Sequence, residues 1–136
     1  MEFNTAFGFV PIDKRRTISK PRKSGITMVS DDQLGLASLS DLIEVAGHYI
    51  DLFKIATGTS RLFEKTHLQA KIEMLRANDI RPFLGGQFQE YVLHTMGVDA
   101  MPRHLSEAQA LGFDIIEVSD NMVQLGQGLR QQLCDM

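Results

Sequence analysis

Lys54 lies late in an apolar segment and is the first residue of this chain whose type and place indicate chemistry. If residues 49–56 form a β-strand, alternation puts Ile50, Leu52 and Lys54 on one face. A lysine on a buried face is costly unless an anion meets it. We therefore predict one of two partners for Lys54. One is a phosphate, carboxylate or enolate of a substrate, and the other is an acid on a neighbouring strand.

Glu117 shows the same pattern with the opposite charge. In residues 113–118, which we expect to form another strand, Phe113 and Ile115 precede Glu117 on one face. A carboxylate in this position suits a metal ligand or a general base. It also suits an ion pair with Lys54, and the two interpretations are compatible because ion pairs are common near active sites.

Polar residues also stand where the expected strands end. Ser119 continues the face of Glu117, and Asp31 and Asp120 end the first and the last strand. Carboxylate oxygens at these points are suitable ligands for a hard metal ion. The alternative for each aspartate alone is a loop or helix cap.

Gly85 and Gly86 follow the expected strand at residues 80–84. Two glycines let backbone N–H groups approach a ligand closely, and a tight turn is the alternative. Glu90 comes early in the next expected helix, residues 89–96, where it is either a functional acid or a charge that suits the helix dipole.

Cations gather just before the first expected strand, residues 26–29. Residues 14–23 contain Lys14, Arg15, Arg16, Lys20, Arg22 and Lys23. Ligands of parallel α/β proteins bind at the carboxyl ends of the strands, so a basic arm that reaches this edge favours a small anionic substrate. A solvated basic tail over residues 1–23 is the alternative.

The segments that must position these residues alternate between strand and helix patterns. The expected strands are residues 26–29, 49–56, 80–84 and 113–118, and the expected helices are residues 39–46, 64–77, 89–96, 106–111 and 124–136. Ser38 and Ser106 have capping-box spacing and are expected to begin two of the helices. Gly47, Asn78 and Gly112 are expected to end helices.

Helix-length connections force parallel pairing of successive strands with right-handed crossovers. Four such strands form either a small open sheet or half of an eight-stranded barrel. Two features favour the half-barrel: the chain stops where a fifth strand is due, and polar residues stand at all four strand ends. The sequence therefore predicts an α/β chain of TIM-barrel type, with about four parallel βα units in one segment, residues 1–136.

Composition narrows the function classes. The chain has 136 residues, 43% of them hydrophobic and 23% charged, which is typical of a globular domain. Residues 24–136 carry eight cations and fifteen anions, a balance that argues against a nucleic-acid partner. No apolar run reaches the ~20 residues of a membrane span. The single cysteine, Cys134, and the absence of a signal-peptide pattern in residues 1–11 fit a cytoplasmic protein.

Taken together, these segments resemble the phosphosulfolactate synthase family. The resemblance covers roughly residues 20–120, and the ordered set is specific although each piece is weak alone. The matching stretches, in the family's order, are Lys20-Pro21-Arg22, Gly25-Ile26-Thr27-Met28-Val29, Tyr49-Ile50-Asp51, Lys54, Gly58-Thr59-Ser60, Gly85-Gly86, Glu90, Leu111-Gly112-Phe113-Asp114 and Ile116-Glu117-Val118-Ser119-Asp120.

The resemblance implies a TIM-type barrel and a magnesium-dependent addition of sulfite to phosphoenolpyruvate. The product would be phosphosulfolactate, on the path to coenzyme M. Magnesium and cationic side chains would stabilise the charge that develops when sulfite adds to the enol carbon. The predicted catalytic residues are Lys54, Glu90 and Glu117, the predicted substrate-binding residues are Lys20, Arg22, Gly85, Gly86 and Ser119, and the predicted metal ligands are Glu117 and Asp120.

The chain also departs from the family pattern around these residues. The family's Gly-Gly-Thr ends in Gln87 here, its Ser-Asp-Gly ends in Asn121, and residues 55–58 read Ile-Ala-Thr-Gly where the synthases carry Leu-Gly-Trp-Gly. One alternative is thus a non-catalytic relative, like the plant heat-stress-associated proteins, that acts through protein contacts. Another is a generic anion-binding α/β domain.

The family's second half is absent from this sequence. A half-barrel leaves two sheet edges and apolar faces uncovered, so we expect the chain to self-associate.

Overall fold

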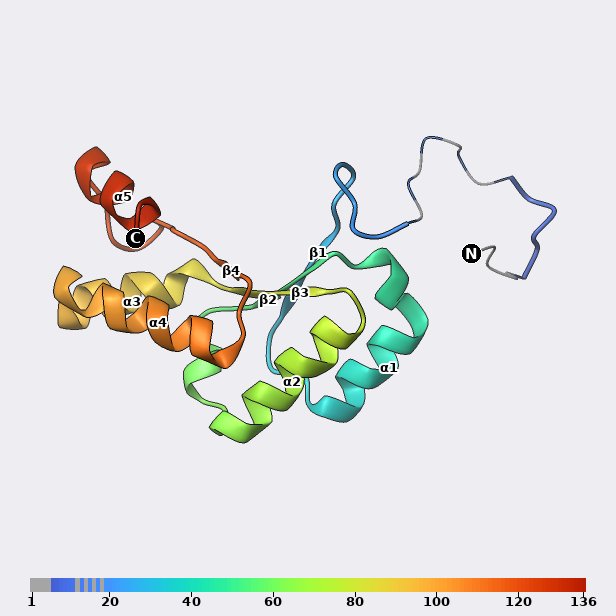
Figure 1. Cartoon of the computed structure of the whole chain (residues 1–136), viewed down its shortest axis with the longest axis horizontal. Coiled ribbons are helices and arrows are strands. Elements are labelled where there is room, and N and C mark those ends of the chain that lie inside the picture. Colours follow the sequence, from blue (N-terminus) through green and yellow to red (C-terminus); the bar gives the residue numbers. More distant parts are fainter. Residues whose placement is uncertain (1–5, 12, 14, 16, 18) are drawn as a thin grey trace.

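The structure is a computed structural model that describes residues 6–11, 13, 15, 17 and 19–136. Four strands form one parallel sheet in the order β1-β2-β3-β4 (Figure 1). The strands are β1 (Met28–Asp31), β2 (Leu52–Ile55), β3 (Arg81–Leu84) and β4 (Ile115–Ile116). The predicted α/β class, with four parallel βα units of a TIM-type half-barrel, is confirmed.

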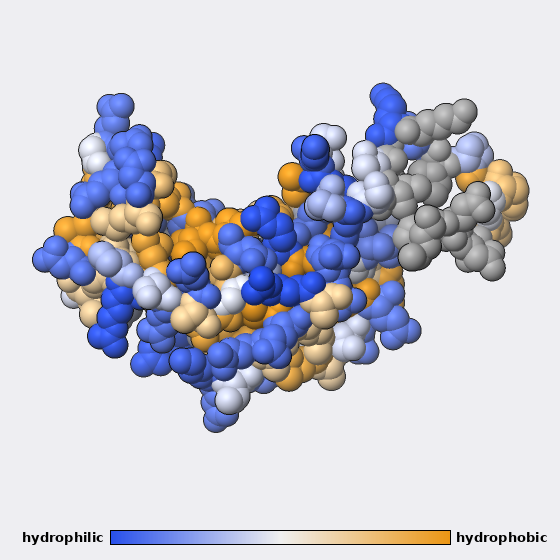
Figure 2. Space-filling model, in the orientation of Figure 1, coloured by the Kyte–Doolittle hydropathy of each residue, from blue (hydrophilic) through white to orange (hydrophobic). Residues whose placement is uncertain are grey.

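Within the described part of the chain, helices cover one face of this sheet, and no helix packs across the other face. They are α1 (Leu36–Ala46), α2 (Lys65–Ala77), α3 (Gly86–Met96), α4 (Met101–Leu111) and α5 (Gln127–Cys134), with short 3₁₀ turns η1 (Gly47–Tyr49), η2 (Thr59–Arg61) and η3 (Val98–Ala100). In Figure 1, α1, α2 and α4 lie below the sheet, whereas α5 stands above its carboxyl ends. Figure 2 shows that the upper outline dips between α5 and the segment before β1, with hydrophobic and hydrophilic side chains in the dip.

The core lies between the sheet and the helices. Phe53 and Ile55 of β2 are fully buried, while Leu52 and Lys54 face the open side and are half-buried. One core cluster contains Leu39, Ile50, Phe53, Leu75 and Ile80. A second contains Ile55, Leu68, Ile72, Leu84, Ala108 and Phe113. Each Leu, Ile and Phe side chain among them stabilises the fold by about 1.5–3 kcal/mol when fully buried.

Ile50 does not share a face with Lys54, contrary to the prediction. The strand begins only at Leu52, and Ile50 packs with Leu39 and Phe53 on the helical side. The alternation rule therefore holds within the strand and fails before it.

Several helix boundaries also differ from those predicted. Helix α1 begins at Leu36, so Ser38 lies inside it and does not cap it. Helix α4 begins at Met101 with Pro102 in its first turn, ahead of the predicted start at Ser106. Proline fits this place because its missing N–H would have had no helical partner.

The end of α2 is set by two neighbouring residues. Asn78, the predicted left-handed stop, has a φ of −111°, and its side-chain amide donates to the Met74 carbonyl at 2.8 Å. The left-handed conformation falls on Asp79, whose φ is 54°. The prediction was thus wrong by one residue.

A fully buried ion pair joins β1 to α2. Lys71 Nζ donates to Asp31 Oδ2 and, at 2.7 Å, to the Leu34 carbonyl. The Leu34 N–H donates to Asp31 Oδ1 at 2.7 Å, and the Lys71 ammonium lies 4.8 Å from the centre of the Phe63 ring. Asp31 therefore anchors a loop and a helix, which was the alternative to a metal ligand.

No helix in the described part of the chain combines the length and the apolar character that a membrane crossing needs. Lys14 and Arg16 of the predicted basic arm lie outside the described residues.

Lys71→Met is expected to lower the free energy of unfolding by about 3–5 kcal/mol, because it leaves the buried Asp31 carboxylate without its counter-ion. Urea unfolding followed by circular dichroism measures this loss. The control is Arg76→Met on the same helix, whose contact with Asp114 is long, 3.6 Å, and half exposed. A loss no larger than that of the control would contradict a stabilising role for the buried pair.

Candidate functional site

Three neighbouring units meet at the carboxyl ends of the strands. Lys54 comes from β2, Glu117 directly follows β4, and Gly86 opens the helix after β3. Lys54 Nζ lies 2.7 Å from Glu117 Oε2, and the Gly86 N–H donates to the same oxygen at 2.7 Å. The ion pair between Lys54 and Glu117, one of the predicted alternatives, is present, although Glu117 lies just beyond β4 and β4 is not the strand next to β2.

Lys54 and Glu117 remain partly open to solvent on the helix-free side of the sheet. Their side chains are 21% and 31% exposed, respectively. An ammonium has three N–H donors, and Glu117 uses only one of those of Lys54. Lys54 can therefore still bind an anionic oxygen from the open side.

The charge state of Glu117 follows from its contacts. Burial raises the pKa of its carboxyl. The hydrogen bonds from Lys54 and the Gly86 N–H, together with the charge of Lys54, lower this pKa by more than burial raises it. Nearby Glu90 opposes this effect. The net lowering keeps Glu117 ionised at neutral pH, so it holds Lys54 in place and does not serve as a proton donor.

The two glycines allow this close packing. A Cβ on Gly86 would lie 2.6 Å from Ser119 Oγ and 3.0 Å from Glu117 Cγ. A Cβ on Gly85 would lie 3.1 Å from Lys54 Cε. The Gly86 N–H was predicted to approach a ligand, but in the structure it donates to Glu117. The two glycines therefore leave room for the side chains of Lys54, Glu117 and Ser119.

Glu90 is completely buried and holds the segment that follows β4. Its carboxylate accepts hydrogen bonds from Ser119 Oγ and from the Met122 and Val123 N–H groups, the last at 2.8 Å. Burial raises its pKa, but these hydrogen bonds outweigh burial and lower the pKa to about 2. The predicted catalytic role does not fit this geometry; Glu90 is a positioning residue that fixes Ser119.

Gln89 is a buried neighbour that sequence reasoning missed. Its Oε1 accepts the Ser119 N–H at 3.3 Å, and its Nε2 has no partner among the described residues. A glutamine in the first turns of a helix gives no signal of burial, because this residue type is mostly exposed.

Asp120 and Glu117, the predicted metal ligands, each form an ion pair with a basic side chain of the chain itself. Asp120 pairs with Arg130 of α5, and both side chains of that pair are half exposed. Within the described residues, no three His, Cys, Asp or Glu side chains come together in a way that would hold a metal ion. The residues present therefore do not fit a magnesium site by themselves, and the magnesium cofactor stays a prediction.

Lys20 lies at the opposite edge of the sheet. Its Nζ donates to the carbonyls of Gly47 at 2.7 Å and of Asn78 and Asp79 at 3.3 Å each. These carbonyls precede β2 and β3, so Lys20 lies at the amino ends of the strands. It joins the ends of two helical connections there.

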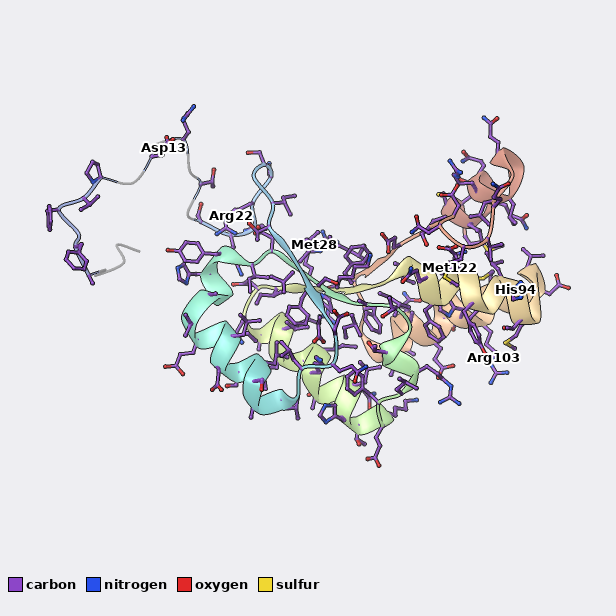
Figure 3. All side chains as sticks on the ribbon, turned by 180° about the vertical axis from the view of Figure 1, so that it is seen from behind. Asp13, Arg22, Met28, His94, Arg103 and Met122 are labelled. Carbon is purple, nitrogen blue, oxygen red and sulfur yellow. The ribbon has the colours of Figure 1, made fainter. Side chains whose placement is uncertain are left out.

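Arg22 occupies the same amino edge. Its guanidinium pairs with Asp51 at 2.7 Å and also donates to the His48 and Tyr49 carbonyls. Figure 3 shows Arg22 and Met122, a residue of the segment held by Glu90, at opposite ends of the sheet. The predicted place of Lys20 and Arg22 was wrong because their segment enters β1 from its amino end. Their predicted substrate contacts gain no support from this place.

Comparison with known proteins now decides the family. The family model described as (2R)-phospho-3-sulfolactate synthase matches residues 15–136. The chain belongs to the phosphosulfolactate synthase family. The resemblance predicted from the sequence is thereby confirmed.

The curated relatives are longer than this chain. The phosphosulfolactate synthase of Methanothermobacter thermautotrophicus is 36% identical over 117 residues, which are 86% of this chain and 44% of that protein. The phosphosulfolactate synthase of Methanocaldococcus jannaschii is 32% identical over 96 residues, 71% of this chain and 37% of the relative. Protein HEAT-STRESS-ASSOCIATED 32 of Arabidopsis thaliana is 28% identical over 109 residues, 78% of this chain and 37% of the relative. The chain thus spans less than half the length of these relatives.

Glu90→Gln is expected to lower the free energy of unfolding by about 1.5–3 kcal/mol at pH 7, because it removes hydrogen bonds to a charged group. The folded pKa of Glu90, about 2, lies below its ordinary value of 4.5. Its ionised form therefore stabilises the fold above pH 4.5, and this contribution is lost as the pH falls towards 2.

Urea unfolding of wild type and variant across this pH range measures the effect. The gap between them should narrow on acidification, and a gap that stays constant or widens would contradict the assignment. Glu44→Gln, at an exposed position of α1, is the control and should change stability by less than about 0.5 kcal/mol.

Arg22→Ala is expected to lower the free energy of unfolding by about 3–5 kcal/mol, because it leaves the buried Asp51 carboxylate unpaired. The control is Arg15→Ala, which removes a cation from an exposed pair with Asp13 and should leave the free energy of unfolding almost unchanged. Thermal and urea unfolding compare the two variants. Equal, small losses would refute the structural role of Arg22.

Proposed function

We propose that the full-length protein containing this chain catalyses the addition of sulfite to phosphoenolpyruvate, with phosphosulfolactate as the product. The family match over residues 15–136 carries this proposal. The site geometry supports it, because Lys54 presents an ammonium at the carboxyl edge, where parallel α/β proteins bind their ligands.

The reaction needs stabilisation of negative charge. The sulfur lone pair of sulfite forms a bond to the methylene carbon, the π electrons move towards C2 and its carboxylate, and a proton then reaches C2. No co-reactant besides that proton is needed. The charge that develops on the carboxylate is what a fixed ammonium stabilises best.

Lys54 is the residue we assign to this task. Glu117 and the Gly86 N–H fix the position of the Lys54 ammonium before substrate binds, so little reorganisation is needed during the reaction. Ser119, which Glu90 holds beside this pair, is our proposed hydroxyl contact to the substrate. No step is assigned to magnesium, whose ligands the described residues do not supply.

Lys54→Ala in the full-length protein is expected to reduce sulfite-dependent consumption of phosphoenolpyruvate by about 10²–10³-fold, the usual effect of losing one group that stabilises transition-state charge. The matched control is Lys23→Ala, an exposed lysine before β1, which should retain wild-type turnover. Unchanged activity of Lys54→Ala would remove Lys54 from the site. Absence of turnover by folded wild-type protein, with magnesium supplied, would refute the proposed reaction.

A non-catalytic role is the second candidate, and two positions favour it. Gln87 and Asn121 replace residues of the synthase pattern, and both lie close in sequence to site residues. The chain is also similar to HEAT-STRESS-ASSOCIATED 32, a protein whose name refers to heat stress and not to a reaction. If the wild-type protein shows no turnover, the double variant Gln87→Thr with Asn121→Gly separates the candidates. Turnover by this variant would show that these two residues cause the loss of activity.

A further inference from the structure

Lys54 and Glu117 do not come from neighbouring strands. β3 lies between β2 and β4, and in the register of the sheet Phe83 pairs with Lys54 on one side and with Ile115 on the other. Adjacent strands lie about 4.8 Å apart. The Lys54 side chain must therefore cross the carboxyl end of β3 before its ammonium can reach Glu117 Oε2 at 2.7 Å. What β3 presents along this path decides where the ammonium lies.

One residue of β3 and one that directly follows it lie along this path. Lys54 Nζ lies over the Phe83 ring, 5.5 Å from its centre, within the ~6 Å over which a ring face attracts a cation. Gly85 leaves the space that the methylene groups of Lys54 occupy, because a Cβ there would lie 3.1 Å from Lys54 Cε. The Lys54 side chain thus passes Gly85, and its ammonium has both the Phe83 ring and the Glu117 carboxylate as neighbours.

The Phe83 ring is not part of the apolar core. Leu84, the next residue of β3, is buried in a cluster with residues of α2 and α4. Strand alternation puts Phe83 on the opposite side of the sheet, where it is half-buried. Phe83 belongs to none of the apolar clusters formed by the described residues. Core packing therefore does not explain a phenylalanine at this position.

An aromatic ring suits this position for an electrostatic reason. The face of the ring is negative, so it attracts the Lys54 ammonium, but the ring has no net charge. A second carboxylate in its place would neutralise the ammonium and use its remaining N–H donors. A leucine would leave the charge of the ammonium intact but would not attract it. A ring thus restrains the ammonium and still leaves its charge to an incoming anion.

We propose that Phe83 is a positioning residue, whose ring holds the Lys54 ammonium where it meets the carboxylate of the substrate. This inference rests on the proposed function, because the role of Lys54 in sulfite addition is part of it. Phe83 acts through Lys54 and exchanges no proton or bond with the substrate. Its effect on turnover should therefore exist only when Lys54 is present.

Lysine side-chain NMR of the full-length protein tests the contact itself. The ring current of Phe83 should shift the Lys54 ε-CH₂ signals away from those of an exposed lysine, and Lys54→Ala assigns these signals by their loss. Phe83→Leu should remove the shift, whereas Phe83→Tyr, which keeps the ring, should retain it. Lys54 signals that are the same in wild type and Phe83→Leu would overturn the proposal.

Phe63→Leu is the matched control. The Phe63 ring is also half-buried, and its centre lies 4.8 Å from the ammonium of a different lysine, Lys71. This variant should alter the Lys71 signals and leave those of Lys54 unchanged. A change of the Lys54 signals as large as that in Phe83→Leu would show that they report general loosening of the fold, and would overturn the proposal.

Turnover measures what the contact contributes. In the full-length protein, Phe83→Leu should lower kcat for sulfite-dependent consumption of phosphoenolpyruvate about 10-fold, and Phe83→Tyr and Phe63→Leu should stay within about twofold of wild type. In the Lys54→Ala background, Phe83→Leu should cause no further loss, because the group through which it acts is gone. An equal loss in both backgrounds would assign Phe83 a structural role and overturn the proposal.

The two measurements separate this inference from the proposed function. A folded wild-type protein without turnover would refute sulfite addition, and the Lys54 signals alone would then decide whether Phe83 positions the ammonium. Phe83→Met, which also removes the ring, replaces Phe83→Leu if that variant does not fold. Wild-type Lys54 signals at the position of an exposed lysine would overturn the proposal whatever the variants show.

Discussion

The carboxylate of Glu117 is the point on which the carboxyl edge of this sheet depends. One oxygen accepts from Lys54 of β2 and from the Gly86 N–H that opens α3, while Glu117 itself extends β4. Three units of the chain are thereby tied at one atom. Because a side chain on Gly86 would collide with Ser119 and Glu117, this tie requires a residue without a Cβ at the helix start. The same contacts fix the ammonium that faces the open side of the sheet.

The two edges of the sheet use positive charge differently. At the amino edge, Lys20 and Arg22 turn inwards onto peptide carbonyls and Asp51, and so join the ends of the helical connections. At the carboxyl edge, Lys54 pairs with Glu117 and stays partly exposed on the face that no described helix covers. Cations that look alike in sequence therefore divide into a structural set and a set suited to an anionic ligand, and the direction of β1 decides which is which.

The features of the fold and the site that follow from periodicity and strand-pairing rules could be predicted from the sequence. Strand alternation offered the Lys54–Glu117 pair as one of two alternatives, and helix-length connections were enough to predict a parallel half-barrel. Burial of Glu90 was not predictable, because it depends on how the segment after β4 turns back over α3. Lys71 was missed for a related reason: a lysine among apolar helix positions normally extends to solvent, and only the position of Asp31 holds it inside.

The pair formed by Asp31 and Lys71 also restricts how this protein can evolve. Two apolar residues of similar volume would serve the fold about as well as the buried ions. Either single replacement, however, passes through a chain with one buried charge and no counter-ion. Replacement of the pair thus requires two substitutions, and the protein with only the first of them is unstable. The pair is therefore retained because the single-substitution step is costly, and not because the ion pair is more stable than an apolar pair.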